Sequence, residues 1–212
     1  MKMVGIEPRP DNDIAGLVLA GGRGTRMCGE DKGLVEFNGK PMIQHVLAAL
    51  RPQVAEVLIS ANRNVERYRK TGCRVVSDLQ EGFAGPLAGV SAGIHAVTRS
   101  HLLVLPCDGP FVPAWLAQRL WAAVAGRNDA IAAAHDGERL HPTFALLPVS
   151  VLDDLDAYLA EGGRKIDKFY YRHAFVAVDF SDYPQAFLNI NTPEDVEKFE
   201  SLAEEWEKSQ EE

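Results

Sequence analysis

The sequence predicts an α/β fold in three layers (α/β/α), with helices on both faces of a mostly parallel, Rossmann-like sheet. Short apolar runs alternate with amphipathic helical patterns along most of the chain, which is typical of βαβ units. The chain has 212 residues and is 46% hydrophobic, so it is long enough to bury a sizeable core. We expect one domain over residues 1–212, with frayed ends at 1–13 and 205–212.

Eight short apolar runs are the expected strands. They are 16–20, 56–61, 74–77, 101–106, 130–134, 143–147, 175–179 and 186–191. The runs 130–134 and 143–147 flank a turn-like Asp136-Gly137-Glu138. We therefore expect them to form a small antiparallel excursion on the parallel sheet.

Amphipathic helices are expected between these strands. Pro41 opens the first at a favoured position, and apolar side chains share one face of the stretch that runs to Leu50. The other expected helices are 86–98, 113–125, 151–160 and 193–207.

The segment 16–33 reads GLVLAGGRGTRMCGEDKG, an apolar run followed by a glycine-rich loop. Glycines let the backbone turn sharply and approach a ligand closely. Arg23, Arg26 and Lys32 add positive charge to the same segment. Backbone N–H donors together with Arg and Lys side chains bind the negative charges of a polyphosphate. The loop is neither a P-loop, because Gly33 follows Lys32, nor a dinucleotide fingerprint, because Met27 takes the third glycine position. It predicts a nucleotide site of another type.

Polar residues follow several of the expected strands, and parallel strands place such residues at one edge of the sheet. They are Asn62, Asp78, Asp108, Asn189 and Asn191. A carboxylate such as Asp108, facing a phosphate loop, is well placed to hold Mg²⁺, although it could also cap a helix. Asn62 and Asp78 are equally compatible with nucleotide contacts and with turns. Asn191 and Thr192 also read as a helix entry.

Gly89 interrupts the expected helix 86–98, where glycine costs about 1 kcal/mol relative to alanine. Either a close ligand or tight helix–sheet packing explains it. Arg139 and His141 are candidate contacts to an anionic substrate. The histidines form no recognisable metal motif, and the three cysteines, Cys28, Cys73 and Cys107, form neither a disulfide framework nor a metal pair.

Charge and hydropathy limit the classes of partner. The net charge of -8 disfavours a general nucleic-acid binder. No apolar stretch approaches the roughly 20 residues of a membrane span, and residues 1–13 do not resemble a signal peptide. We expect a cytoplasmic protein without nucleic-acid or membrane partners.

Several motifs occur in a specific order and spacing between residues 16 and 200. They are Leu19-Ala20-Gly21-Gly22, Arg26-Met27, Asp31-Lys32-Gly33-Leu34, Asn38-Gly39-Lys40-Pro41, Ala61-Asn62-Arg63, Gly85-Pro86-Leu87-Ala88-Gly89, Pro106-Cys107-Asp108, His135-Asp136-Gly137-Glu138-Arg139, His141-Pro142-Thr143 and Asn189-Ile190-Asn191-Thr192-Pro193-Glu194. With them the chain resembles the molybdenum cofactor guanylyltransferases, a family of Rossmann-like nucleotidyltransferases. It departs from the family pattern at Cys28, where a glycine is usual.

The resemblance implies a role for each matching position. The nucleotide side comprises Leu19, Ala20, Gly21, Gly22, Lys32, Asn62, Asp78, Gly85, Gly89 and Asp108. Lys32 would meet the phosphates, Arg26 would help to neutralise charge, and Asp108 would hold Mg²⁺. Asn189 and Asn191 match further functional positions. We expect the pterin-side contacts at Arg139, His141, Arg164, Lys165, Asn189 and Asn191.

The implied reaction joins GTP to molybdopterin carrying molybdenum, giving the guanine dinucleotide cofactor and pyrophosphate. A phosphate monoester attacks the α-phosphate in line, so the work is positioning and charge neutralisation rather than general-base catalysis. Molybdenum-insertion proteins and acceptor molybdoenzymes are the implied protein partners. The alternatives are a cytidylyltransferase acting on the same pterin and a non-catalytic protein that binds and delivers the cofactor; a dehydrogenase is disfavoured by Met27.

Overall fold

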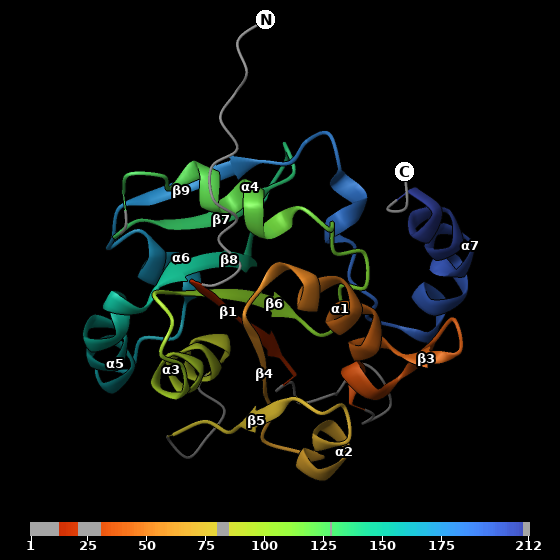
Figure 1. Cartoon of the computed structure of the whole chain (residues 1–212), viewed down its shortest axis with the longest axis horizontal. Helices are drawn as coiled ribbons and strands as arrows, with labels where there is room; N and C mark the ends of the chain where they lie inside the picture. Colours follow the sequence, from red (N-terminus) through yellow and green to blue (C-terminus); the bar gives the residue numbers. More distant parts are fainter. Residues whose placement is uncertain (1–12, 21–30, 80–84, 128, 210–212) are drawn as a thin grey trace, which may run out of the picture.

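A computed structural model describes residues 13–20, 31–79, 85–127 and 129–209. Its centre is a seven-stranded sheet in the order β5–β4–β1–β6–β8–β7–β9 (Figure 1). The strands are β1 (Ile14–Leu19), β4 (Glu56–Ser60), β5 (Arg74–Val76), β6 (His101–Pro106), β7 (Ile131–His135), β8 (Leu140–Pro148) and β9 (Phe175–Asp179). Among these strands β8 alone is antiparallel to its neighbours. The expected α/β class and its antiparallel excursion are confirmed.

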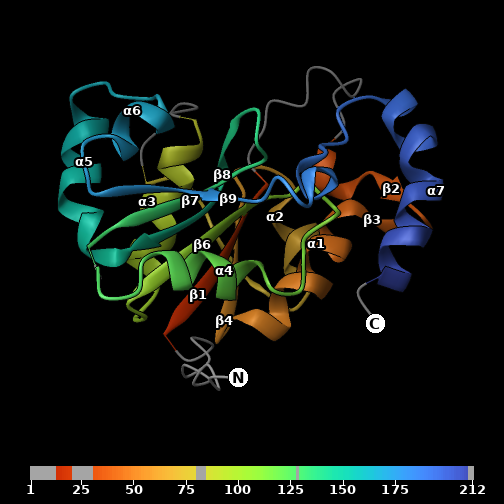
Figure 2. The ribbon, with the colours of Figure 1, turned by 90° about the horizontal axis from the view of Figure 1, so that it is seen from above.

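Helices cover both faces of the sheet. They are α1 (Met42–Leu50), α2 (Val65–Arg69), α3 (Pro86–Ala96), α4 (Leu116–Ala123), α5 (Leu152–Ala160), α6 (Ile166–Tyr170) and α7 (Pro193–Ser209). Helices α3, α5 and α6 share a core with one sheet face, whereas α1 and α4 share a core with the other. Figure 2 shows α3, α5 and α6 on the opposite side of the sheet from α1 and α7.

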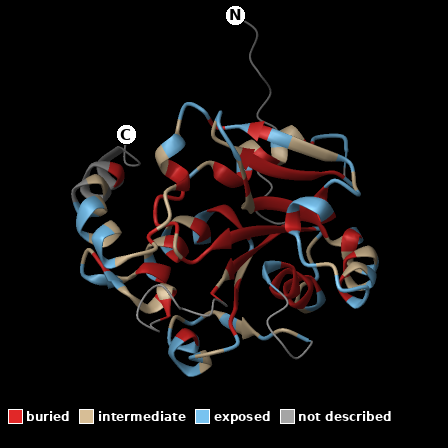
Figure 3. Ribbon diagram, turned by 180° about the vertical axis from the view of Figure 1, so that it is seen from behind, coloured by how far each residue is buried: buried red, intermediate tan, exposed pale blue. Residues whose placement is uncertain are grey.

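The strands carry most of the burial. Every residue of β6 is buried, and Leu17 and Val18 of β1 are fully inaccessible. Figure 3 shows strands that are buried for most of their length, whereas the helices turn exposed residues outward. A continuous apolar run such as that of β6 is what a central strand covered on both faces requires. This packing fixes the carboxyl ends of β1, β4 and β6, on which the site is built.

One expected strand is wrong. Residues 186–191 form no ladder; they continue from a short 3₁₀ helix, Pro184–Phe187, into an irregular segment. Ala186, Phe187 and Ile190 are buried in the core, and the Ile190 N–H donates to the Asp108 carbonyl at 2.8 Å. The strand-like pattern therefore reflects burial against the end of β6 rather than pairing within the sheet.

The sequence does not predict the shortest helices and strands. Helices α2 and α6 have five residues each, too few for a helical period to show. A hairpin of β2 (Glu36–Phe37) and β3 (Lys40–Pro41) turns at Asn38 and Gly39, which both have positive φ, as a two-residue hairpin turn requires.

The C-terminal helix extends beyond its expected end. The expected helix ends at residue 207, whereas α7 continues to Ser209, and Trp206 is buried with its ring 6.0 Å from that of Phe111. Within the described part of the chain, no helix combines the length and apolar character that crossing a membrane requires.

Candidate functional site

The charged centre of the site consists of Lys32, Asp108 and Asn191. The Lys32 ammonium donates to Asp108 Oδ2 at 2.8 Å and to Asn191 Oδ1 at 2.5 Å. The Lys32 and Asp108 side chains are 25% and 14% exposed, so the pair is partly buried yet open to a ligand. The structure thus brings together three of the predicted site residues from distant parts of the chain.

Backbone hydrogen bonds hold Asp108 at the end of β6. The Cys107 N–H donates to the Leu19 carbonyl at 3.1 Å, which extends the β1–β6 ladder by one step. The Ile190 N–H donates to the Asp108 carbonyl on the other side. Asn191 is fixed in turn at the start of α7, because Asp195 accepts hydrogen bonds from the N–H groups of Asn191 and Thr192. Asn191 therefore belongs to the helix entry and also contacts the site.

Asn62 and Asp78 form a second pair on the same sheet edge. Asn62 Nδ2 donates to Asp78 Oδ2 at 2.8 Å, and the Asp78 N–H donates back to Asn62 Oδ1 at 2.9 Å. Burial raises the pKa of Asp78, and the hydrogen bond from Asn62 partly opposes that rise. The pair joins the ends of β4 and β5 and presents a carboxylate there.

Leu19 and Gly89 meet where α3 packs on the sheet. A Cβ on Gly89 would lie 2.5 Å from Ser60 Oγ and 2.9 Å from Leu19 Cδ2, so tight packing alone accounts for this glycine. Gly85, at the start of α3, has a φ of +79°, a conformation that favours glycine. Ala20 is buried and its N–H donates to the Ser60 carbonyl at 2.8 Å.

The predicted pterin-side residues fall into separate groups. His141 is buried, stacks on Phe187 with ring centroids 4.4 Å apart, and pairs with Asp136 at 2.6 Å. Burial lowers the pKa of His141, against the effect of Asp136. Arg139 is more exposed and lies 3.9 Å from the same carboxylate.

Asn189 lies beside Gly109, the residue after Asp108. Its Oδ1 is buried without a hydrogen-bond partner among the described residues, and a Cβ on Gly109 would lie 3.3 Å from it. A buried acceptor without a partner is costly, so a ligand group or water is expected to satisfy it.

Arg164 and Lys165 lie between α5 and α6. The Arg164 guanidinium donates to the carbonyls of Leu159 and Gly163, and a Cβ on Gly85 would lie 3.8 Å from the Arg164 carbonyl. The structure thus places this basic segment by the N-terminus of α3, whereas Arg139 directly precedes β8 and His141 lies in it.

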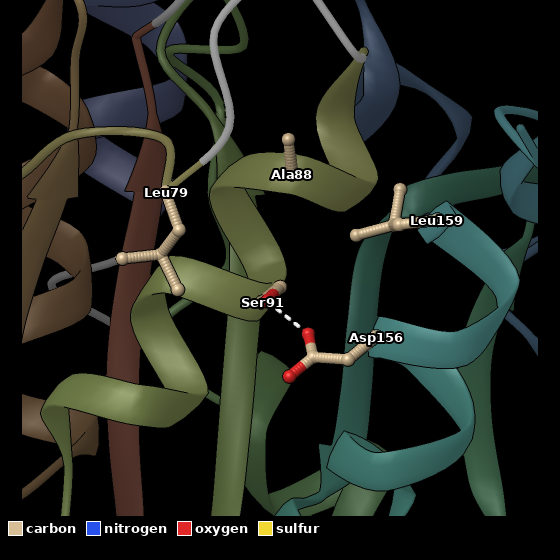
Figure 4. A pocket seen from close by; sticks show the side chains of 5 residues that line it. All are labelled: Leu79, Ala88, Ser91, Asp156 and Leu159. Atoms are coloured by element: carbon tan, nitrogen blue, oxygen red, sulfur yellow. Dashed lines mark hydrogen bonds between the residues drawn. The ribbon is translucent and has the colours of Figure 1, made fainter.

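A pocket of about 170 Å³ opens between α3 and α5 (Figure 4). It is lined by Leu79, Ala88, Ser91, Asp156 and Leu159. Ser91 donates to Asp156 at 2.6 Å, which ties the two helices together. Leu79 follows Asp78 directly, so the pocket lies next to the Asn62–Asp78 pair but does not include Lys32 or Asp108.

Some predicted residues lie outside the described part of the chain. Gly21, Gly22, Arg26 and the irregular position Cys28 fall within residues 21–30. Among the residues that the structure does describe, no three His, Cys, Asp or Glu side chains gather as a metal site.

Sequence reasoning missed a buried cluster behind Lys32. Asp31 is 7% exposed and accepts hydrogen bonds from the Tyr68 hydroxyl at 2.5 Å and from Asn64 Nδ2 at 3.1 Å. Asp31 belongs to a motif, but nothing in the sequence distinguishes Tyr68 from a surface residue of a short basic segment.

Comparison with known proteins is consistent across sequence and structure. Residues 16–175 match the MobA-like NTP transferase domain. A molybdenum cofactor guanylyltransferase of Shewanella baltica (strain OS155) is 47% identical over 183 residues, 86% of this chain and 93% of that protein. The protein of the same name from Shewanella halifaxensis is 43% identical over 91% of this chain and 96% of its own length.

Solved structures share the fold at lower identity. The molybdopterin-guanine dinucleotide biosynthesis protein A of Archaeoglobus fulgidus superposes with a TM-score of 0.75 at 24% identity, covering 90% of this chain and 99% of that one. A 4-diphosphocytidyl-2C-methyl-D-erythritol synthase from Anaerococcus prevotii gives 0.70 at 12% identity, with coverage of 92% and 98%.

Proposed function

The chain belongs to the MobA-like NTP transferase family, and we propose that it transfers GMP from GTP to molybdopterin carrying molybdenum. The products are the guanine dinucleotide cofactor and pyrophosphate. Relatives bearing the name molybdenum cofactor guanylyltransferase are 43–48% identical over nearly their whole length, which supports this choice of nucleotide and acceptor.

The cluster of Lys32, Asp108 and Asn191 is the observation that carries the proposal. An ammonium, a carboxylate and an amide converge within hydrogen-bond distance at the end of β6. A partly buried cation of this kind neutralises phosphate charge more strongly than one in bulk water. Lys32 is the phosphate-binding residue in this proposal, and Arg26 adds a second cation.

We propose Mg²⁺ as the cofactor, held by Asp108. Mg²⁺ is usually bound by one or two carboxylates together with substrate phosphates and water, so a single carboxylate suffices. The buried Oδ1 of Asn189 beside Gly109 adds an oxygen acceptor that lacks a partner among the described residues. When bound, the ion would supply charge neutralisation at the phosphates. Lys32 would then exchange its contact with Asp108 for one with phosphate.

The other assignments follow from the same arrangement. We assign Asn62, Asp78, Leu19, Ala20, Gly21, Gly22, Gly85 and Gly89 to the nucleotide side, and Arg139, His141, Arg164, Lys165, Asn189 and Asn191 to the pterin side. A nucleophile that is already a phosphate dianion needs no general base, so binding and orientation are the main tasks of these residues. We place the reaction in the cytoplasm, which the free thiols of Cys73 and Cys107 favour. Molybdenum-insertion proteins and molybdoenzymes are the proposed protein partners.

The test is pyrophosphate release from GTP or CTP in the presence of Mg²⁺ and molybdenum-loaded molybdopterin. We expect turnover with GTP to exceed that with CTP at least about tenfold, a discrimination that one lost hydrogen-bonded contact supplies. Asp108→Ala should reduce kcat about 10²–10³-fold, the typical cost of removing one electrostatic group. Asp182→Ala is the matched control, because Asp182 also pairs with a cation, Arg119 at 3.0 Å, on the surface.

Two results would contradict the proposal. Equal or greater turnover with CTP would make the chain a cytidylyltransferase acting on the same pterin. No pyrophosphate release by wild type or Asp108→Ala, together with tight binding of the finished cofactor, would identify a delivery protein.

A further inference from the structure

We propose that Tyr68 is a positioning residue, which acts through Asp31 to hold Lys32 where the nucleotide phosphates bind. Tyr68 lies on α2, and its hydroxyl donates to Asp31 rather than to Lys32. The inference rests on the proposed function, because that function assigns Lys32 to the phosphates.

Asp31 is the link between Tyr68 and Lys32. It directly precedes Lys32, and its carbonyl accepts the Leu34 N–H at 2.8 Å, which starts the short 3₁₀ turn Lys32–Leu34. Its two carboxylate oxygens accept different donors, Oδ1 from the Tyr68 hydroxyl and Oδ2 from Asn64 Nδ2. A carboxylate held by two donors fixes the backbone from which the Lys32 side chain starts.

The packing around Tyr68 makes this contact specific. Its side chain is fully buried, and burial strongly raises the pKa of its hydroxyl, with the hydrogen bond to Asp31 adding to the rise. The hydroxyl is therefore protonated at neutral pH and donates to Asp31. A Cβ on Gly33 would lie 2.8 Å from this oxygen and 3.2 Å from Cys107 Cβ, so the absence of a side chain at Gly33 lets the phenol reach Asp31.

The loop between β4 and α2 also contacts the proposed nucleotide side of the site. Asn64 adopts a left-handed φ of 51°, which directs the chain from β4 into α2, and Asn62 in the same loop pairs with Asp78. One loop thus contacts both Asp31 and Asp78, and it links the phosphate end of the site to the end of β5.

The long side chain of Lys32 explains why such a support matters. Lysine is a point charge on a flexible four-carbon stem, so its backbone anchor and its acceptors together decide where the charge lies. A displacement of about 1 Å at a reacting group reduces the rate about 10²-fold. Asp108 and Asn191 fix the ammonium end, and Asp31 with Tyr68 fixes the backbone end.

The test is Tyr68→Phe, which removes only the hydroxyl. We expect the affinity for GTP with Mg²⁺, measured by calorimetry, and kcat/KM for pyrophosphate release to fall about tenfold, as for a buried carboxylate that loses a donor. In a Lys32→Ala background the same change should alter GTP affinity less than about twofold, because two residues that act through one contact are not additive.

Tyr170→Phe is the matched control. Tyr170 is also fully buried and its hydroxyl donates to the Pro142 carbonyl at 2.9 Å, but it belongs to the core on the other face of the sheet. Both variants should lower Tm to a similar extent, whereas Tyr68→Phe alone should weaken GTP binding. Equal GTP affinities for the two variants, or an undiminished Tyr68→Phe effect in the Lys32→Ala background, would overturn the proposal.

Asn64→Gly tests the same proposal with a substitution at an exposed position. Glycine keeps the left-handed backbone and removes the amide that holds Asp31 Oδ2, so the variant is expected to fold and to weaken GTP binding in the same direction. Wild-type affinity in this variant would count against the role of Asp31, whatever the fate of Tyr68→Phe. Failure of the wild type itself to bind or turn over GTP would instead reject the proposed function.

Discussion

Cys107 separates Pro106, the last residue of β6, from Asp108, and its side chain lies in the core near Gly33 and Tyr68. Burial raises the pKa of its thiol, and the neighbouring Asp108 adds to the rise. The reactive form of cysteine is the thiolate, so a buried thiol of raised pKa is inert. A cysteine next to Asp108 is therefore compatible with a reaction that uses no thiol.

We predict that iodoacetamide at pH 7.5 alkylates Cys73 and leaves Cys107 unmodified in the folded protein. Cys73 is partly exposed, whereas Cys107 is 7% exposed. Mass spectrometry of peptides after timed labelling distinguishes these sites from each other and from Cys28. Labelling of Cys107 at the rate of Cys73 would contradict the burial described for it, and unfolding in urea before labelling is the positive control.

The residues of the site differ in how far sequence could predict them. Lys32 and Asp108 were predicted because a glycine-rich loop and a strand end give them context, and the structure joins them. Asp31 and Tyr68 were missed because their contact spans 37 positions and involves a helix of five residues. Side chains that support a charged group from behind leave no local pattern, since any buried donor in the right place suffices.

At the scale of elements, the packing of α3 on β1 and β4 depends on Gly89. We predict that Gly89→Ala lowers the free energy of unfolding by about 1–3 kcal/mol, the usual cost of overpacking. The added Cβ would lie 2.5 Å from Ser60 Oγ, and this clash exceeds the gain of about 1 kcal/mol from helix propensity. Urea denaturation of the wild type and of Gly89→Ala measures the difference in the free energy of unfolding.

Ser60→Ala tests the origin of that loss. Removing the hydroxyl takes away the nearest clashing atom, so the double variant should recover part of the stability, while Leu19 Cδ2 at 2.9 Å still limits the recovery. A stable Gly89→Ala variant with weakened GTP binding would instead favour close approach of a ligand as the reason for this glycine.

The elements also show where periodicity fails as a guide. The run 101–106 is a short, continuous apolar stretch that predicts a buried strand, and it forms β6. Residues 186–191 also read as a strand, because apolar and polar side chains alternate at their end, but they form the end of a 3₁₀ helix and an irregular segment in which the Ile190 N–H donates to the Asp108 carbonyl. Alternation reports which side chains are buried; it does not report whether a neighbouring strand is available.

At the scale of the whole molecule, topology assembles a site that no segment contains. Lys32 and Asn191 are 159 positions apart, and they meet because the chain crosses the entire sheet before α7 returns to the end of β6 (Figure 1). Phe111 contacts the rings of both Phe199 and Trp206, so the docking of α7 fixes the position of Asn191. The sequence predicts the strands and helices, but this return depends on tertiary packing.

The stability of the whole fold should depend on pH through two buried histidines. His101 contacts the Trp121 ring at 4.9 Å between centroids, and its Nε2 lacks a hydrogen-bond partner among the described residues. Burial lowers the pKa of His101, against the effect of Asp13, and burial also lowers that of His141. The unfolded chain, with histidine pKa values near about 6.5, then binds more protons than the folded protein. Their stabilising contribution is therefore complete above about pH 6.5 and is lost as the pH falls toward the lowered pKa values.

We predict that the free energy of unfolding decreases between pH 7.5 and 5.5, with a limiting slope of about 1.4 kcal/mol per pH unit for each proton taken up. His101→Phe keeps an aromatic ring in the core and removes one titrating group, so its profile should be flatter than that of the wild type. Burial raises the pKa of Asp78, so Asp78 makes the free energy of unfolding decrease as the pH rises, opposite to the histidines. Asp78→Asn removes this effect and should make the loss of stability at acid pH steeper. Urea titrations at four pH values measure these slopes. A His101→Phe profile parallel to the wild type would show that protonation of His101 does not couple to unfolding, and a wild-type free energy that rises toward pH 5.5 would contradict the sign for both histidines.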